Sequence, residues 1–384
     1  MQQRQYGRLG YEVSLLGMGC MRLPRIQEES SVEIDKEKAI ELIRYAAGHG
    51  VNYFDTAYAY HGTKSESLLG EALDGGYRRR VKIVTKQPYN VMNNDKGKIR
   101  ENLENTLKKL RTNFIDVYLI HNIGPATWEA IKKLNVIEEY EKFRAEGLIG
   151  GIAFSYHGDA ETYRQIVDFY NWDMVQIQQN ILDINNQATE AGIAYAARTG
   201  AAVVIMEPLR GGGLAQAPKD VQALYDQFPI KRTPAEWAFR HLYDNPDVTC
   251  ILSGMTTLEQ LKQNIETFSA PDAVANAMTQ EEKDLIKKVR EIYEARISIP
   301  CTKCEYCMPC PNGVNIPTVF SLYNEAKMLE VWDNPRRMYM LARRGKMDAA
   351  QCVQCGLCES ECPQNIKIMD QLALAHKALD GWNE

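Results

Sequence analysis

Short apolar runs alternate with amphipathic stretches over the first 270 residues of the chain. Eight of these runs have the length and composition of buried strands. They are Ser14–Met18, Tyr53–Ala57, Lys82–Thr85, Ile115–Ile120, Gly151–Phe154, Met174–Gln178, Val203–Met206 and Thr249–Leu252. Residues 36–47 and 99–110 between them have helical spacing of apolar positions. Eight strands alternating with helices over about 250 residues predict an α/β fold of the (β/α)₈ TIM-barrel type.

An open, doubly wound sheet also has alternating strands and helices, so it is the alternative to the closed barrel. Dinucleotide-binding sheets of that type carry a G-x-G-x-x-G turn directly after an early strand. No such motif follows an early strand here, and the run Gly211 to Gly213 comes late in the chain and is a weak match. We therefore favour the closed barrel.

The cysteines are distributed unevenly. Only Cys20 and Cys250 fall within the first 300 residues, and the other eight of the ten lie between Cys301 and Cys362. The N-terminus does not resemble a signal peptide, and no apolar run is long enough to span a membrane, so we expect a cytoplasmic protein. In that compartment, dense cysteine indicates metal or cluster ligation and argues against a disulfide framework. The net charge of −5 gives no basic surface for nucleic acid.

The eight clustered cysteines form two motifs. The first reads C-x₂-C-x₂-C-x₂-C-P and the second C-x₂-C-x₂-C-x₃-C-P. The second has the spacing of bacterial ferredoxins, in which the fourth cysteine ligates the other cluster. If the ligands cross in this way, the two sets are Cys301, Cys304, Cys307, Cys362 and Cys352, Cys355, Cys358, Cys310. The first motif is one residue short before its last cysteine.

Zinc is the alternative metal for these motifs, since it also binds four thiolates from paired C-x₂-C motifs. Zinc ligands come as two knuckles separated by a longer loop, whereas here a triple C-x₂ run ending in Cys-Pro occurs twice. The pattern favours two [4Fe–4S] clusters.

Composition also changes along the chain. Ala270–Pro271 resembles a linker, and Thr279-x-x-Glu282 predicts a capping box that opens a charged helix through about Arg296. Further helices are expected over 318–330, 335–344 and 369–379. We therefore expect a barrel over 1–270, a linker and helix over 271–298, and a small, mainly α-helical ferredoxin-like domain over 299–384.

Four titratable residues close or follow predicted strands at their carboxyl ends: Asp55, Tyr60, Lys86 and His121. Each has a structural explanation when taken alone: a helix cap, a loop aromatic, a solvated strand end and a hydrogen-bonded core histidine. Active sites of TIM barrels lie at the carboxyl ends of the strands, so the four side chains are expected to meet there. Their combination predicts a catalytic site.

These residues lie in motifs that resemble the aldo-keto reductase family. The motifs are Tyr-Phe-Asp55-Thr-Ala-Tyr-Ala-Tyr60, Ser65-Glu66-x₃-Gly70, Val-Thr-Lys86 and Asp116-Val-Tyr-Leu-Ile-His121, with Gly17-Met-Gly, Ala153-Phe-Ser155, Val175-Gln176, Pro208-Leu-Arg-Gly-Gly and Ser253-Gly254. The resemblance runs from about Gly7 to Asn264. With the cysteine motifs added, the chain is similar to the prokaryotic iron–sulfur aldo-keto reductases.

The resemblance implies that NADPH or NADH reduces a small-molecule carbonyl. Hydride addition to a carbonyl leaves an alkoxide, so a proton donor and a positive field are needed at the oxygen. Tyr60 would be the acid, and Lys86, paired with Asp55, would lower the pKa of its hydroxyl. His121 would orient the substrate oxygen.

The resemblance also implies a set of cofactor contacts. Ser155 and Gln176 would bind the nicotinamide carboxamide, and Met206 would pack on the ring. The pyrophosphate would follow Pro208, Leu209, Arg210, Gly211 and Gly212. The adenosine would lie among Ser253, Gly254, Met255, Thr256, Gln260, Gln263 and Asn264.

Two departures from the family pattern bear on the cofactor. Tyr156 stands where an asparagine usually contacts the carboxamide. The end of the eighth strand lacks the Lys and Arg that usually bind a 2′-phosphate, and Gly254 and Gln260 stand there instead. Without them, the protein would prefer NADH, or the 2′-phosphate of NADPH would be bound by Arg210 or Lys262 instead. Candidate walls of the substrate pocket are Met21, Arg22, Tyr58, Trp128 and Tyr156.

Three interpretations of the function remain open at this point. The first is a nicotinamide-dependent reductase of a carbonyl or activated double bond, with Tyr60 as acid. The second is a reductase whose clusters receive single electrons from a ferredoxin-like partner. In the third, the clusters are purely structural. The sequence shows both redox devices without showing that electrons pass between them.

Overall fold

A computed structural model of the chain describes residues 1–26, 33–92 and 94–381. The chain divides into two compact units. The first consists of Met1–Arg210 and Glu236–Gln280, and the second of Gly211–Ala235 and Glu281–Glu384. In the part of the chain that the structure describes, no helix has the length and apolar character needed to cross a membrane.

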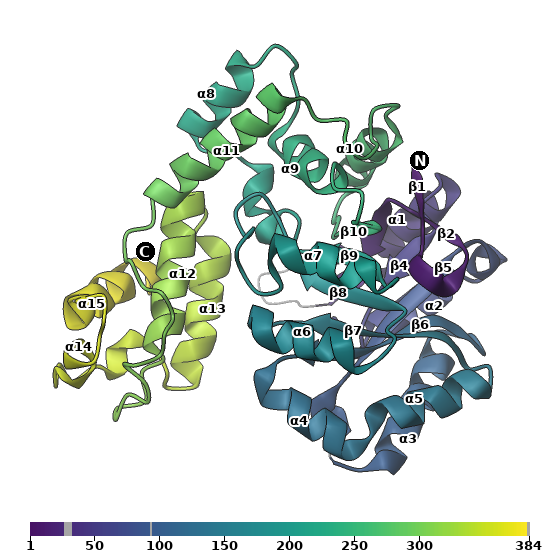
Figure 1. The fold of residues 1–384 in the computed structure, drawn as a ribbon, viewed down its shortest axis with the longest axis horizontal. Helices are drawn as coiled ribbons and strands as arrows, with labels where there is room; N and C mark the ends of the chain where they lie inside the picture. Colours follow the sequence, from purple (N-terminus) through teal and green to yellow (C-terminus); the bar gives the residue numbers. More distant parts are fainter. Residues whose placement is uncertain (27–32, 93, 382–384) are drawn as a thin grey trace. The chain divides into compact units, whose positions relative to one another are not determined.

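The first unit contains a closed barrel of eight parallel strands (Figure 1). In barrel order they are β10 (Cys250–Ser253), β3 (Leu16–Gly19), β4 (Tyr53–Asp55), β5 (Lys82–Pro88), β6 (Ile115–Ile123), β7 (Ile149–Tyr156), β8 (Met174–Gln178) and β9 (Ala202–Met206). Each overlaps one strand expected from the apolar pattern, so the predicted (β/α)₈ fold is confirmed.

Helices of this unit alternate with the strands. They are α1 (Lys36–Gly48), α2 (Ser65–Ala72), α3 (Lys96–Lys109), α4 (Pro125–Leu134), α5 (Val136–Ala145), α6 (Ala160–Phe169), α7 (Thr189–Arg198), α9 (Pro234–Tyr243, whose first two residues belong to the second unit) and α10 (Leu258–Ser269). Short 3₁₀ helices are η1 (Gly7–Leu9), η2 (Cys20–Arg22), η3 (Tyr77–Arg80) and η4 (Tyr89–Val91). The carboxylates of Asp35, Asp95 and Asp159 accept from backbone N–H groups and cap α1, α3 and α6.

An N-terminal hairpin precedes the barrel and was not expected from the sequence. It pairs β1 (Gln3–Gln5) with β2 (Glu12–Ser14) in antiparallel fashion. The strand predicted from Ser14 onward is therefore two elements, because Ser14 ends β2 and the barrel strand β3 begins at Leu16. The continuous apolar run hides this break. Tyr6, between the two hairpin strands, packs with Tyr53 in the apolar cluster inside the barrel.

The second unit is mainly helical. It contains η5 (Arg210–Ala215) and α11 (Gln280–Ala295), each apart from its first residue, which belongs to the first unit. Its other helices are α8 (Lys219–Gln227), α12 (Ile316–Leu329), α13 (Asp333–Arg344), η6 (Ala349–Gln351), α14 (Leu357–Ser360) and α15 (Ile368–Leu379). The helices expected over 318–330, 335–344 and 369–379 correspond to α12, α13 and α15. Thr279 immediately precedes α11, where the capping box was expected.

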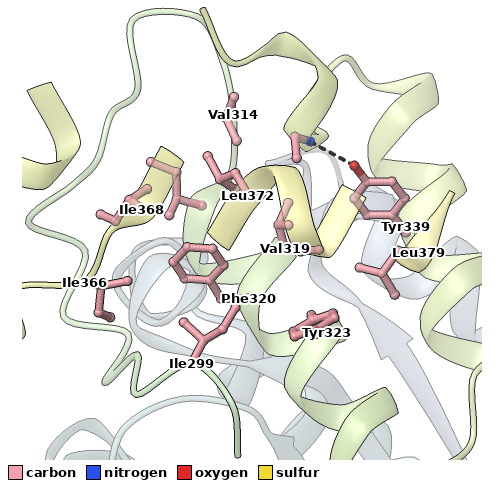
Figure 2. Close-up of a cluster of buried hydrophobic side chains, with 13 residues drawn as sticks. Ile299, Val314, Val319, Phe320, Tyr323, Tyr339, Ile366, Ile368, Leu372 and Leu379 are labelled. Atoms are coloured by element: carbon pink, nitrogen blue, oxygen red, sulfur yellow. Dashed lines mark hydrogen bonds between the residues drawn. The ribbon is translucent and has the colours of Figure 1, made fainter. Parts of the chain in front are cut away.

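A separate apolar core holds the C-terminal helices together. Figure 2 shows Phe320 of α12 facing Ile366 and Ile368, with Leu372 of α15 beside them. The Tyr339 hydroxyl accepts from the backbone N–H of Ala349 at 3.1 Å. All four cysteines that end or begin the two motifs pack against this core: Cys301, Cys310, Cys352 and Cys362. The cysteine motifs are therefore supported by a core of their own.

Candidate active site and cluster site

Lys86 lies at the centre of a buried polar group near the carboxyl ends of β4 and β5. Its Nζ atom donates to Oδ1 of Asp55 at 2.5 Å, to the Thr56 carbonyl at 2.9 Å and to the Tyr60 hydroxyl at 3.3 Å. Asp55 and Lys86 are 2% and 1% exposed. The two strands pair in parallel with Asp55 opposite Val84, which brings both side chains to the same end of the barrel. The Thr56 carbonyl is a partner that no side-chain pattern predicts.

Electrostatics favour a charged lysine and a protonated tyrosine. Burial alone would lower the pKa of Lys86, but the Asp55 carboxylate and Tyr60 raise it above its ordinary value. Burial raises the pKa of the Tyr60 hydroxyl, and the neighbouring Lys86 ammonium opposes that rise. At neutral pH, Tyr60 therefore retains a proton beside a positive charge.

His121 on β6 completes the predicted group of four. Its ring meets the Tyr60 ring edge-on, with centroids 6.0 Å apart. Burial, with the charges of Lys86 and His157, lowers the pKa of His121 to about 3. A neutral imidazole has one N–H donor, and His121 Nδ1 has no hydrogen-bond partner among the described residues. The ring is thus able to donate to a ligand oxygen.

Ser155 and Gln176 lie directly opposite each other on β7 and β8. Both side chains are buried, and Gln176 Oε1 has no hydrogen-bond partner in the part of the chain that the structure describes. Met206 ends β9, paired with Gln178 of β8. Three of the residues expected at the nicotinamide therefore lie on consecutive strands at the carboxyl end of the barrel.

Tyr156 does not face the barrel mouth as a pocket wall. Its hydroxyl donates to the Asp159 carbonyl at 2.5 Å, and its ring packs on Phe154 and Tyr163. The residue is fully buried. Hydrogen bonding to the α6 N-terminus occupies the hydroxyl, so Tyr156 does not replace the asparagine amide. Tyr58, another expected wall, lies with its ring 4.8 Å from the Lys109 ammonium.

Residues expected around the adenosine form a hydrogen-bonded turn between β10 and α10. Asn264 donates to the Ser253 hydroxyl at 3.0 Å. Gln260 Oε1 accepts from the Thr256 N–H at 2.9 Å, and Gln260 forms a capping box with Thr257 at the start of α10. Gln263 donates to Glu259 one turn away.

The two cations considered for a 2′-phosphate both contact groups of the protein. Arg210 pairs with Asp183 at 3.1 Å, and the Lys262 ammonium lies 5.7 Å from the centre of the Tyr45 ring. Asp183 also accepts from Gln178 and Asn180, each at 2.8 Å. This buried polar cluster was missed, although the amide run at positions 178–180 signals it.

The eight cysteines of the second unit separate into two groups. Cys301, Cys304, Cys307 and Cys362 line one cavity, which Phe320 and Ile368 also border. Cys310, Cys352, Cys355 and Cys358 line a second cavity of about 210 Å³, to which Cys307 also contributes. The last cysteine of each motif therefore lies with the first three of the other.

The pKa values of two buried thiols show the same grouping of cysteines. Burial raises the pKa of the Cys307 thiol, and Cys301, Cys304 and Cys362 are the neighbours that raise it further. Burial likewise raises the pKa of Cys358, to about 11, with Cys352 and Cys310 adding to the rise. Iron bound at these positions would offset the cost of forming buried thiolates, because a coordinated thiol loses its proton to become the metal ligand.

The donor set fits iron–sulfur clusters. Each group offers four thiols, the soft ligands that such clusters take, beside a buried apolar core. Among the described residues, no three Cys, His, Asp or Glu side chains surround a point where a single metal ion would bind.

Comparison with known proteins identifies the barrel region and the region that carries the eight cysteines. The aldo/keto reductase family profile matches residues 15–283. The chain belongs to this family. A 4Fe-4S dicluster domain profile matches residues 300–367, so this aldo/keto reductase carries a C-terminal domain of that type. The resemblance stated from the sequence motifs is confirmed.

Three relatives span most of the aldo/keto reductase. "Uncharacterized oxidoreductase YqkF" of Bacillus subtilis (strain 168) is 23% identical over 334 residues, covering 78% of this chain and all of the relative. Aldo-keto reductase AKR11C1 from Bacillus halodurans is 26% identical, with a TM-score of 0.63 over 75% of this chain and 96% of its own. An aldo-keto reductase from Klebsiella pneumoniae, solved with NADPH, shares the fold at 20% identity and a TM-score of 0.61, covering 76% and 96%.

Proposed function

We propose that this aldo/keto reductase uses NADPH or NADH to reduce the carbonyl, or activated double bond, of a small molecule. For a carbonyl the product is an alcohol, with Tyr60 as the proton donor. One observation carries the proposal: the Lys86 ammonium contacts the Asp55 carboxylate and the Tyr60 hydroxyl inside a buried site. A purely structural ion pair has no need of the third group.

The proton side of the reaction follows from this geometry. Tyr60 donates its proton to the oxygen that becomes an alkoxide, and the Lys86 ammonium stabilises the tyrosinate that remains. Asp55 keeps Lys86 charged and directed at Tyr60. Neutral His121 donates a hydrogen bond to the same substrate oxygen and orients it. The nicotinamide, when bound, supplies the hydride.

Residues on β7 to β10 would bind the cofactor. Ser155 and Gln176 present buried polar groups on neighbouring strands, and the free Gln176 Oε1 suits the amide N–H₂ of nicotinamide. Met206 would offer the ring a polarisable surface. The capped turn at 253–257 would receive the adenosine, and Pro208 to Gly212 the pyrophosphate. The Klebsiella relative solved with NADPH supports this class of cofactor.

The cysteines would hold two [4Fe–4S] clusters with crossed ligands. One set is Cys301, Cys304, Cys307 and Cys362, and the other is Cys352, Cys355, Cys358 and Cys310. When present, such clusters transfer single electrons. Cys304 and Cys355 are exposed, one from each set. This exposure favours a second candidate function, in which a ferredoxin-like partner delivers electrons through the clusters.

Replacement of the acid tests the primary proposal. Anaerobically purified protein is assayed for NADPH and NADH oxidation against aldehydes, ketones and enones. Tyr60→Phe should lower turnover about 10²- to 10⁴-fold, as expected for loss of a general acid. Tyr195→Phe, which removes a surface hydroxyl bonded to Asp168, serves as the matched control. Full turnover by Tyr60→Phe would contradict the assignment.

A further inference from the structure

In both cysteine motifs, a polar side chain from a helix holds a residue shortly before the first cysteine. In the first motif that residue is Ile299, two positions before Cys301. In the second motif it is Ala349, three positions before Cys352. Both residues are buried in the apolar core of the C-terminal helices. All four lie in the second unit, and the two cysteines line different cavities.

Asn324 of α12 holds the first motif. Its amide oxygen accepts from the Ile299 N–H at 3.0 Å, and its amide nitrogen donates to the Ile299 carbonyl at 2.7 Å. The Cys301 N–H donates to that same carbonyl at 2.7 Å. A carboxamide carries both donors and an acceptor, so one side chain satisfies both backbone groups of Ile299. Asn324 therefore fixes the carbonyl to which Cys301 is bonded.

Tyr339 of α13 holds the second motif through Ala349 (Figure 2). Its buried hydroxyl accepts from the Ala349 N–H at 3.1 Å, and the Ala349 carbonyl accepts from the Cys352 N–H at 3.1 Å. Ala349 is the first residue of η6. Asp348, just before it, is fully buried and accepts from the Gln351 side chain at 2.9 Å. The short turn that leads to Cys352 is therefore ordered from its first residue.

His376 of α15 directs the Tyr339 hydroxyl. Its Nδ1 atom lies 2.7 Å from the hydroxyl oxygen. Because that oxygen accepts from the Ala349 N–H, its own proton is available for donation to Nδ1 of a neutral imidazole. The opposite ring nitrogen, Nε2, lies 3.8 Å from the Asp380 carboxylate. The second motif is thus ordered by a chain of polar groups, whereas a single amide orders the first.

We propose that Asn324 and Tyr339 are positioning residues for two different [4Fe–4S] clusters. Asn324 acts through Cys301, and Tyr339, directed by His376, acts through Cys352. The proposal rests on the binding of clusters by the eight cysteines proposed above. It does not depend on ligand crossing, because Cys301 and Cys352 belong to different sets in the crossed and in the uncrossed arrangement. Groups that orient metal ligands typically contribute about 10- to 100-fold in metal affinity.

Selective loss of one cluster tests the proposal. Anaerobic holoprotein is treated with an iron chelator and iodoacetamide, and the alkylated cysteines are identified over time by mass spectrometry. In Tyr339→Phe, the first three cysteines of the second motif should react about tenfold faster, with those of the first motif unchanged. Asn324→Leu should give the reverse pattern. Tyr323→Phe, which removes a hydroxyl from the same apolar core, is the matched control and should react like the wild type.

Two further measurements separate positioning from general support of the fold. His376→Ala leaves the Tyr339 ring in the core and should accelerate alkylation of the second motif only. Redox titration followed by electron paramagnetic resonance should show one midpoint potential shifted in Tyr339→Phe and the other in Asn324→Leu.

Equal acceleration of both motifs in these variants, or rates like those of the wild type in Tyr339→Phe and Asn324→Leu, would overturn the proposal. Wild-type protein that is purified anaerobically without iron and sulfide would instead contradict cluster binding itself.

Discussion

The ammonium of Lys86 donates to the hydroxyl of Tyr60 over 3.3 Å, and it lies 4.9 Å from the centre of the same ring. A positive charge in this position favours tyrosinate over neutral tyrosine. Burial acts in the opposite direction and raises the pKa of Tyr60. Proton donation depends on the balance between these two effects, and the balance depends on Asp55.

Asp55→Asn tests that dependence. The variant removes the carboxylate that raises the pKa of Lys86, so burial will lower that pKa. Lys86 will then lose its charge at lower pH, and the alkaline decline of kcat should move to lower pH than in the wild type. Profiles measured from about pH 6 to about pH 11 will show this shift, since they extend past the ordinary lysine pKa of about 10.4. Superimposable profiles would mean that Asp55 does not control Lys86.

The same variant should lower stability. On the alkaline side, the contribution of Lys86 is complete below the ordinary lysine pKa of about 10.4 and is lost as pH rises through the higher folded value. On the acid side, the pair is lost when Asp55 takes up a proton, and burial raises the pKa of that carboxyl. Breaking a buried pair typically costs about 3–5 kcal/mol. Thermal unfolding of Asp55→Asn at neutral pH should therefore begin well below that of the wild type.

His121 should remain neutral through the working range. Burial lowers its pKa to about 3, so kcat/KM should show no inflection near the ordinary histidine pKa of about 6.5. His121→Asn keeps a hydrogen-bond donor and should retain part of the activity, with the same flat profile across neutral pH. An inflection near that ordinary value that disappears in His121→Asn would show that the imidazole titrates.

Paired cysteine variants distinguish crossed from uncrossed ligands. Cys301→Ser/Cys362→Ser removes two ligands of one proposed set, so one cluster of about four irons should remain. Cys301→Ser/Cys310→Ser affects both sets and should leave little stable iron. Iron and sulfide analysis after anaerobic purification measures both. Uncrossed ligation predicts the reverse result for the two double variants.

Introduction of a cation tests the interpretation of the adenosine end. Thr256 is exposed at the turn before α10, and Arg210 and Lys262 contact other protein groups. We expect NADPH and NADH to bind the wild type with similar affinity. Thr256→Arg should tighten NADPH about tenfold with little change for NADH, because charge-assisted hydrogen bonds contribute about 1.5–3 kcal/mol. A strong NADPH preference in the wild type would contradict this.

The barrel was predictable because its strands are apolar, short and regularly spaced. Asp55, Lys86 and His121 follow from the rule that sites lie at strand carboxyl ends. The hairpin before the barrel was not predictable, because residues 13–16 form a nearly continuous apolar run across two elements.

Long-range partners were the other omission. Gly213 meets Leu329 and Asp220 meets Arg296 across more than 70 residues of sequence, and no local pattern joins such pairs. Tyr156 illustrates the opposite case, since its orientation is decided by the Asp159 carbonyl and its aromatic neighbours. Its position in the sequence predicted a wall of the substrate pocket, whereas its side chain packs among Phe154, Tyr163 and the Asp159 carbonyl.

The origin of the electrons separates the reductase from the cluster-fed alternative. The decisive measurement is reduction of an accepted carbonyl by NADPH carrying deuterium at both hydrogen positions of nicotinamide C4, with mass analysis of the alcohol. We expect one deuterium on the carbon that was the carbonyl, and a rate that falls at least about 10²-fold in Tyr60→Phe. Alcohol formed without deuterium would show that hydride transfer is not the route, and would contradict the proposed mechanism.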